Sequence, residues 1–189
     1  VLGSFQKDGN GWGEGMEPKW IKGPDIFLKT VNAIKHQVSE LYVLLTGPAR
    51  GYVKSGLERI GIPYRHHYLT DYRQIGKYFH ALDAYLITSR EEGGPKAVLE
   101  SMASGIPLIS TPVGQGQDLI SKGLNGELAS SFDPEELANL TLNVLSQNEK
   151  ERIRQAGRIT AEQNTHSGQL KLWREFFHPL LTDRKVCKI

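Results

Sequence analysis

The chain alternates short apolar runs with amphipathic segments over most of its length. Short apolar runs bounded by Gly, Pro or polar residues predict β-strands. Six runs fit this description: residues 1–5, 41–46, 64–69, 84–88, 106–110 and 126–129. The runs 84–88 and 106–110 are almost continuously apolar, as expected of strands that are covered on both faces.

Segments with helical spacing of apolar residues separate these runs. Helices are expected over residues 24–38, 52–60, 72–82, 95–104 and 116–121. Repeated strand–helix–strand units with short linkers predict a parallel sheet that has helices on both faces. We therefore expect an α/β fold, a Rossmann-like sheet of about six strands.

The final third of the chain predicts helices only. Asp133 suits the N-cap of a helix, Pro134 its first position and Glu136 the third, so a capping box is expected. Further helices are expected over residues 149–163 and 169–181. The last helix has one strongly apolar side, formed by Leu170, Trp173, Phe176, Phe177 and Leu180. We divide the chain into a Rossmann-like domain, residues 1–165, and a C-terminal helix and tail, residues 166–189.

Composition and charge exclude several classes of protein. The formal net charge is +2, and Lys and Arg are not gathered into a basic stripe, so nucleic-acid binding is not indicated. No apolar stretch approaches the roughly 20 residues that span a bilayer. Cys187 is the only cysteine, which predicts a reducing compartment such as the cytoplasm.

The stretch from residue 6 to residue 20 is rich in glycine and has no regular signal. It follows the first expected strand and precedes a helix, where Rossmann-like folds hold phosphates. It does not match the G-x-G-x-x-G pattern, and it is longer than a tight turn. A flexible surface loop and a phosphate-binding loop therefore both stay open.

A second loop, after the strand at residues 84–88, carries the clearest chemistry. Gly93 and Gly94 let the backbone come close to a ligand, and Pro95 is expected to begin a helix. The N-terminal end of a helix favours a bound anion. Glu92 and Glu100 flank this point, so we expect them to accept hydrogen bonds from hydroxyls at the two ends of a bound diphosphate.

Glu92 and Glu100 are separated by seven residues and are followed by Ser-Met-Ala-Ser-Gly-Ile-Pro. This segment resembles the E-x7-E signature of the large retaining glycosyltransferase family with two Rossmann-like domains (GT-B fold; glycosyl transferases group 1, family 4). Residues 111–120, 123–126 and 133–137 are similar to the same family in the same order. The resemblance implies that the chain is the C-terminal, donor-binding half of such an enzyme.

The resemblance implies roles for individual residues. Glu100 would bind the ribose hydroxyls of a nucleoside diphosphate sugar, and Glu92 would contact hydroxyls of the transferred sugar. Lys22 matches the lysine that neutralises the diphosphate, whose negative charge grows as it leaves. The donor would also be held by the segment that contains Gly93, Gly94, Pro95, Lys96 and Ala97.

One position departs from the family pattern. An arginine usually follows the glycine of the first strand and contacts the phosphates, but here Gly3 is followed by Ser4. Ser4 is therefore included among the expected donor-binding residues. Lys7, in the same loop, is the candidate to replace the arginine, and Arg90 and Lys96 are other nearby cations that stay open for this role. The chain has no Asp-x-Asp pair, so neither a bridging metal nor any cofactor besides the donor substrate is expected.

The expected reaction is transfer of a sugar to an acceptor hydroxyl with retention at the anomeric carbon. The family mechanism implies that the leaving phosphate takes the acceptor proton. The acceptor, a glycan, a lipid or a small molecule, would bind a missing N-terminal domain, which is also expected to make any peripheral contact with a membrane. This segment alone would then be inactive. Two alternatives stay open: a nucleotide-sugar epimerase of related fold and a non-catalytic nucleotide-binding module.

Overall fold

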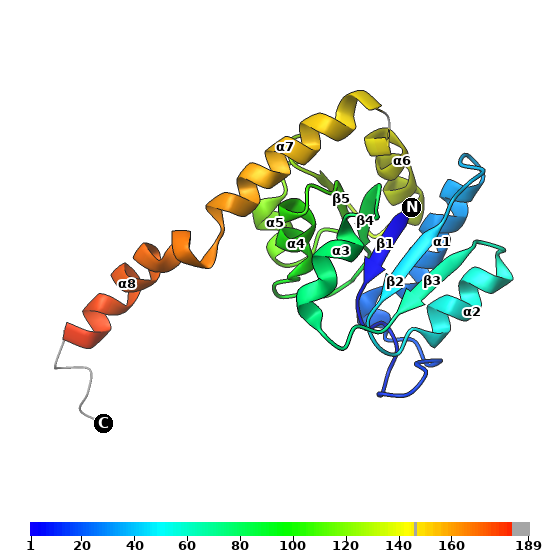
Figure 1. Ribbon diagram of the computed structural model, residues 1–189, viewed down its shortest axis with the longest axis horizontal. Coiled ribbons are helices and arrows are strands. Elements are labelled where there is room, and N and C mark those ends of the chain that lie inside the picture. Colours follow the sequence, from blue (N-terminus) through cyan, green and yellow to red (C-terminus); the bar gives the residue numbers. More distant parts are fainter. Residues whose placement is uncertain (146, 183–189) are drawn as a thin grey trace.

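The structure, a computed structural model, describes residues 1–145 and 147–182 and contains one parallel sheet (Figure 1). The spatial order of its strands is β3-β2-β1-β4-β5-β6. The strands are β1 (Leu2–Phe5), β2 (Val43–Thr46), β3 (Tyr64–His67), β4 (Ala84–Ile87), β5 (Leu108–Ser110) and β6 (Glu127–Leu128). Each lies within a predicted range, so the predicted Rossmann-like class is confirmed.

Helices follow the strands and cover both faces of the sheet (Figure 1). They are α1 (Pro24–Lys35), α2 (Gly51–Arg59), α3 (Ile75–Phe79), α4 (Ala97–Ala103), α5 (Gln115–Leu119), α6 (Pro134–Leu145), α7 (Gln147–Gln163) and α8 (His166–Thr182). Two 3₁₀ turns, η1 (Trp20–Lys22) and η2 (Tyr72–Gln74), precede α1 and α3.

Alternation along the strands divides the core into two layers. On β2, Val43 and Leu45 face one side of the sheet, where α1, α2 and α6 pack, while Leu44 faces the other. On β4, Leu86 belongs to the first layer and Tyr85 to the second, where α3 and α4 pack. Successive side chains of a strand point to opposite faces, so both faces of these strands must be apolar.

Two helix starts differ from the sequence-based expectation. The helix expected over residues 72–82 is interrupted, because the Asp71 side chain accepts a hydrogen bond from Arg73 N at 3.0 Å and fixes η2 before α3 begins. The helix expected from Pro95 begins at Ala97. Val98 N donates to Pro95 O at 3.0 Å, so the chain enters α4 through a tighter turn.

The start of α6 keeps half of the predicted capping box. Asp133 Oδ1 accepts a hydrogen bond from Glu135 N at 3.2 Å, which confirms its capping role. The prediction of the reciprocal bond is wrong, because Asp133 N donates to Ser131 Oγ at 3.2 Å and not to Glu136. Its carboxylate accepts instead from the backbone N–H groups of Ser130 and Ser131, at 2.8 and 3.2 Å, and so fastens the preceding loop.

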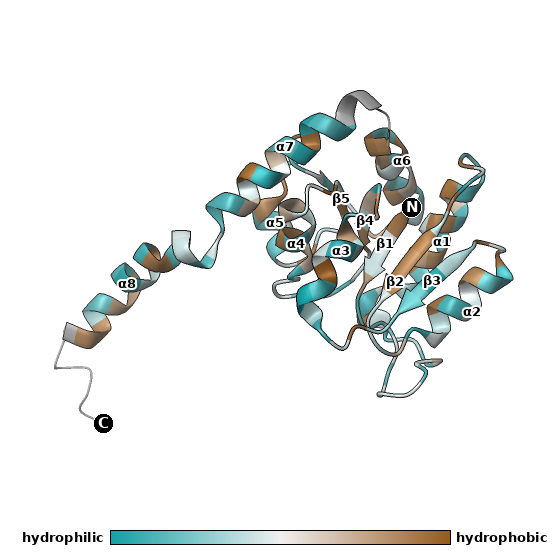
Figure 2. Ribbon diagram, in the orientation of Figure 1, coloured by the Kyte–Doolittle hydropathy of each residue, from teal (hydrophilic) through white to brown (hydrophobic). Residues whose placement is uncertain are grey.

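The last two helices relate differently to the sheet. α7 packs on α4, and Arg154 and Arg158 donate to Gly105 O and Ala103 O, carbonyl groups at the C-terminal end of α4 that need partners. α8 projects away from the domain (Figure 1), and hydrophobic positions alternate with hydrophilic ones along its ribbon (Figure 2). Its large apolar side chains are exposed. Cys187 and the rest of the tail, 183–189, lie outside the described residues.

Candidate functional site

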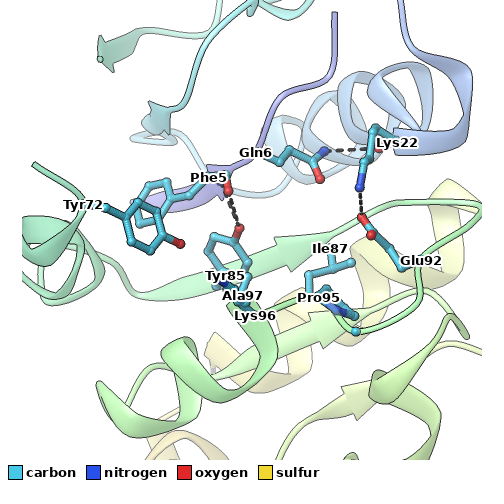
Figure 3. Close-up of a pocket in the computed structure, with 11 residues that line it drawn as sticks. Phe5, Gln6, Lys22, Tyr72, Tyr85, Ile87, Glu92, Pro95, Lys96 and Ala97 are labelled. Carbon is cyan, nitrogen blue, oxygen red and sulfur yellow. Dashed lines mark hydrogen bonds and ion pairs between the residues drawn. The ribbon is translucent and has the colours of Figure 1, made fainter. Parts of the chain in front are cut away.

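A cavity of about 260 Å³ lies at the carboxyl ends of β1 and β4, where the strand order reverses. In open α/β sheets this switch point is the usual place for a ligand. Figure 3 shows the side chains that line it. They are Phe5, Gln6, Lys22, Tyr72, Tyr85, Ile87, Glu92, Gly94, Pro95, Lys96 and Ala97. Six of the predicted site residues are therefore gathered around one opening.

Lys22 and Glu92 form an ion pair across this cavity (Figure 3). Lys22 Nζ donates to Glu92 Oε1, and Ser89 Oγ donates to the same oxygen at 2.9 Å. The side chains of Lys22 and Glu92 remain 22% and 15% exposed, so a ligand in the cavity can reach both. The cation and the acceptor thus belong to one preformed unit.

The position of Lys22 is fixed by its own turn. Gly23, which follows it, has φ +60°, and a Cβ there would lie 1.8 Å from Thr88 O. Only glycine allows the turn to approach the end of β4 this closely. From the β1 side, Gln6 Nε2 donates to Lys22 O at 3.1 Å. Two neighbouring strands therefore place this lysine.

Arg90, although adjacent, is occupied by structural contacts. It donates to Trp20 O at 2.9 Å and to the two carboxylate oxygens of Asp25 at 2.8 and 2.7 Å. Burial raises the pKa of Asp25, but the hydrogen bonds and charge of Arg90 outweigh this, and the pKa lies below its ordinary value. Arg90 therefore fastens η1 to the start of α1 instead of facing the cavity.

Glu100 lies in the first turn of α4; it is outside the lining of the cavity but contacts Tyr72, which lines it. Its two carboxylate oxygens accept from the hydroxyl of Tyr72, each at 2.9 Å. Burial raises the pKa of Glu100, and the Tyr72 hydrogen bond and the charge of Lys96 only partly offset this. Burial, followed by the charge of Glu100, raises the pKa of Tyr72, so Tyr72 stays a donor.

Ser4, Lys7 and Gly93 are placed outside the lining of this cavity. Ser4 is fully buried, and its Oγ accepts from Arg50 Nη2 at 3.1 Å. The ammonium of Lys7 lies 3.8 Å from the ring centroid of Trp12, a cation–π contact, and Lys7 lines an adjoining cavity of about 270 Å³. Gly93 O accepts from Gln115 N at 2.9 Å and so shapes the loop beside Gly94.

Five lining residues were missed by the sequence analysis: the apolar Phe5 and Ile87, and the polar Gln6, Tyr72 and Tyr85. Gln6 directly follows β1, and Tyr72 belongs to the turn after β3. The carboxyl ends of parallel strands meet at one edge of the sheet. The positions of Gln6 and Tyr72, just after two strands, could therefore have indicated that both lie near the site. Tyr85 gave no such indication, because it lies inside β4, where its hydroxyl accepts from Phe5 N at 3.0 Å and joins β1 to β4.

Within residues 1–145 and 147–182, no group of three or more His, Cys, Asp or Glu side chains is arranged to hold a metal ion. In the same part of the chain, no helix is both long and apolar enough to cross a membrane.

The parallel sheet, whose strand order reverses between β1 and β4, defines a Rossmann-like α/β domain with Lys22, Lys96 and Glu92 around its switch point. Residues 13–147, more than half of the chain, match the family model described as glycosyl transferases group 1. The chain belongs to this family.

One curated relative is the lipopolysaccharide core biosynthesis mannosyltransferase LpsB of Rhizobium meliloti (strain 1021). It is 27% identical over 109 residues, which cover 54% of this chain and 31% of LpsB. The chain spans less than half the length of the curated relatives that it matches.

Solved glycosyltransferase structures share the fold. The Anabaena protein Alr3699/HepE in complex with UDP superposes with a TM-score of 0.72 at 21% identity, over 96% of this chain and 48% of that one. The C-terminal domain of LpcC, a group 1 family protein from Francisella tularensis, superposes with a TM-score of 0.70 at 18% identity. That match covers 86% of this chain and 84% of the LpcC domain.

Proposed function

We propose that the chain is the donor-binding, C-terminal half of a retaining glycosyltransferase that uses a nucleoside diphosphate sugar. The observation that carries the proposal is the Lys22–Glu92 pair in the cavity at the switch point of a group 1 chain, with Glu100 joined to the cavity lining through Tyr72. Cations together with carboxylates from the two ends of the segment 92–100 match a ligand with a diphosphate and hydroxyl groups on both sides of it.

The proposed donor lies across the cavity in one direction. Glu100 accepts from the ribose hydroxyls, Lys22 and Lys96 face the diphosphate, and Glu92 accepts from hydroxyls of the sugar. The adjoining cavity, which shares Phe5, Gln6 and Tyr72 with the first, gives room for the nucleoside. HepE has been solved with UDP and with UDP-glucose, which makes uridine nucleotides the first donors to test. Lys7 stays a proposed second cation for the phosphates.

The proposed chemistry retains the configuration at the anomeric carbon. The bond between this carbon and the β-phosphate oxygen breaks, the acceptor oxygen bonds to the carbon on the same face, and the leaving phosphate takes the acceptor proton. Lys22 stabilises the negative charge that develops on the leaving group, and Glu92 orients the sugar. The E-x7-E spacing of Glu92 and Glu100 supports this mechanism.

The proposed acceptor site belongs to a second domain. The chain spans about half of HepE but most of the LpcC C-terminal domain, which supports this division. The exposed apolar side of α8, with Trp173, Phe176 and Phe177, is the proposed surface for packing toward that domain. The scarcity of cysteine supports a reducing compartment, and peripheral contact with a membrane through the second domain stays a prediction.

The test is nucleotide binding by the 189-residue chain, measured by calorimetry and by NMR. UDP, GDP and ADP are titrated first, then UDP-glucose. We expect one nucleoside diphosphate to bind, with shifts in the amide signals of residues 92–100 and of Lys22 and Gly23. Lys22→Met should weaken the binding of the nucleoside diphosphate, whereas Lys171→Met, on exposed α8, should leave it unchanged. Shifts confined to α7 and α8, or no binding of any of these nucleotides, would contradict the proposal.

A further inference from the structure

Arg50, at the start of α2, is buried beneath the ends of β1 and β2 and is 1% exposed. Its Nη1 donates to Ser4 O at 2.7 Å, to Gln6 O at 2.8 Å and to Thr46 O at 3.0 Å. Its Nη2 donates to Ser4 Oγ at 3.1 Å. One guanidinium group therefore holds the backbone at the point where β1 passes into the glycine-rich segment, residues 6–20.

Asp8 in the same segment provides the opposite charge. Its Oδ2 lies 3.1 Å from Arg50 Nη2, and both side chains are fully buried. Among the described residues, neither oxygen of Asp8 accepts an aligned hydrogen bond. Burial raises the pKa of Asp8, and the charge of Arg50 opposes this increase. A buried pair without aligned hydrogen bonds is a weak source of stability, which favours a different reason for its presence.

The glycine-rich segment is an ordered loop that is docked on α2. Gly51 N and Tyr52 N, in the first turn of α2, donate to Glu14 O and Gly15 O at 2.6 and 2.9 Å. These helix-start N–H groups have no partner inside the helix. A Cβ on Gly15 would lie 2.2 Å from Ala49 O, so this approach requires glycine.

The loop is also connected to the cavity. Gln6, whose carbonyl Arg50 holds, donates through its side chain to Lys22 O, and Lys22 forms the ion pair with Glu92. The far end of the loop leads directly into η1, where Lys19 N donates to Asp8 O at 2.8 Å. Both ends of the loop therefore depend on the Arg50–Asp8 pair.

We propose that Arg50 is a positioning residue that fixes the glycine-rich segment and, through Gln6, holds Lys22 in place at the diphosphate site. The inference rests on the proposed function only for its ligand. Lysine cannot replace this arginine, because an ammonium group lacks the planar fork that reaches several acceptors at once. Arg50 itself is buried and does not touch the donor.

The first experiment measures amide hydrogen exchange by NMR in the nucleotide-free chain, comparing Arg50→Lys with the wild type. The N–H groups of Asn10, Lys19, Gly51 and Tyr52 bond within the loop or between the loop and α2, and those of Lys22 and Gly23 bond within η1. We expect exchange at all six to accelerate by about tenfold or more, since tenfold corresponds to about 1.4 kcal/mol. Glu100 N, inside α4, should keep its wild-type rate.

The second experiment compares the affinities for UDP and UMP in the same variant. UMP lacks the β-phosphate, so it depends less on Lys22. Arg50→Lys should lower the UDP affinity by about tenfold while the UMP affinity stays nearly constant, because a misplaced Lys22 loses its charged contact with the β-phosphate. A purely structural role would lower both affinities equally, or neither.

Three further variants guard against a general loss of folding. Gly15→Ala should undock the loop and reproduce both effects with Arg50 still present. Its matched control is Gly13→Ala, where a Cβ meets no atom within 4 Å and φ is not positive. Arg158→Lys, which removes another guanidinium bound to a backbone carbonyl, controls for the change of side chain.

The outcomes separate this inference from the proposed function. The exchange experiment tests the positioning role without nucleotide. If exchange in Arg50→Lys accelerates in the loop but stays at the wild-type rate at Lys22 and Gly23, the positioning role is overturned. An unchanged ratio of UDP to UMP affinity would overturn it as well. If the wild-type chain binds no nucleotide but exchange at Lys22 and Gly23 accelerates in Arg50→Lys, the positioning role stands and the proposed function fails.

Discussion

The hydroxyl of Tyr72 donates to both carboxylate oxygens of Glu100, at 2.9 Å from each. The two residues come from η2 and from the first turn of α4, and the contact joins these elements beside the cavity. An ionised carboxylate has about four acceptor positions, so Glu100 can bind Tyr72 and still accept from a ribose diol. Tyr72 therefore orients the carboxylate without blocking it.

Glu100→Gln should weaken the binding of UDP without destabilising the domain. A hydrogen bond to a charged group contributes about 1.5–3 kcal/mol, so its loss should cost about tenfold in affinity or more. Burial raises the pKa of Glu100, so its ionised form disfavours the folded state above that pKa, and a neutral residue should not lower the melting temperature. Calorimetry and a thermal melt test both statements, and unchanged affinity would show that Glu100 does not contact the ligand.

The affinity for UDP should decrease in acid because of Glu100. Its raised pKa means that the carboxylate is protonated at a higher pH than an ordinary glutamate, and the ionised form is the better acceptor. Tyr72→Phe removes a hydrogen bond that favours ionisation, so the decrease should begin at a higher pH still. In Glu100→Gln only the titration of the nucleotide phosphate should remain. Identical pH profiles for all three proteins would contradict this assignment.

Glu92→Ala should separate the binding of the sugar from that of the nucleotide. The change removes the partner of Lys22, so bare UDP should bind as well as before or more tightly. UDP-glucose should lose about tenfold in affinity relative to UDP, because its hydroxyls lose a charged acceptor. Glu91→Ala, one position earlier and outside the cavity lining, is the matched control. Equal weakening of UDP and UDP-glucose would mean that Glu92 only supports the loop.

Asn125→Ala should destabilise the domain and leave UDP affinity unchanged. Asn125 is buried, and its side chain bonds Ser121 N, Leu119 O and Thr160 Oγ1 at 2.8, 2.9 and 2.9 Å. Leaving these buried groups without hydrogen-bond partners should lower the free energy of unfolding by about 2–3 kcal/mol. Denaturant unfolding measures this loss, with the exposed Asn10→Ala as the control. A weaker UDP complex at unchanged stability would assign Asn125 to the ligand instead.

The sequence predicted the parts of the site that depend on neighbouring residues. Glu92 and Glu100 are separated by one loop and one helical turn, so their spacing alone sets them on either side of the start of α4. It did not predict the state of the glycine-rich segment, for which a flexible loop and a phosphate-binding loop were both open. Its order depends on Arg50, which lies far along the chain and whose burial no local pattern indicates.

By itself, the sequence determined the α/β class, the six strands and the position of the two glutamates, because apolar periodicity and short-range spacing are properties of contiguous residues. Only the tertiary structure decided that Lys22 pairs with Glu92, that Tyr72 meets Glu100, and that Arg50 supports Ser4 and Gln6. These contacts join residues from different crossovers of the sheet. They depend on β1 lying between β2 and β4, and periodicity along the chain specifies which face of a strand is apolar but not which strands become its neighbours.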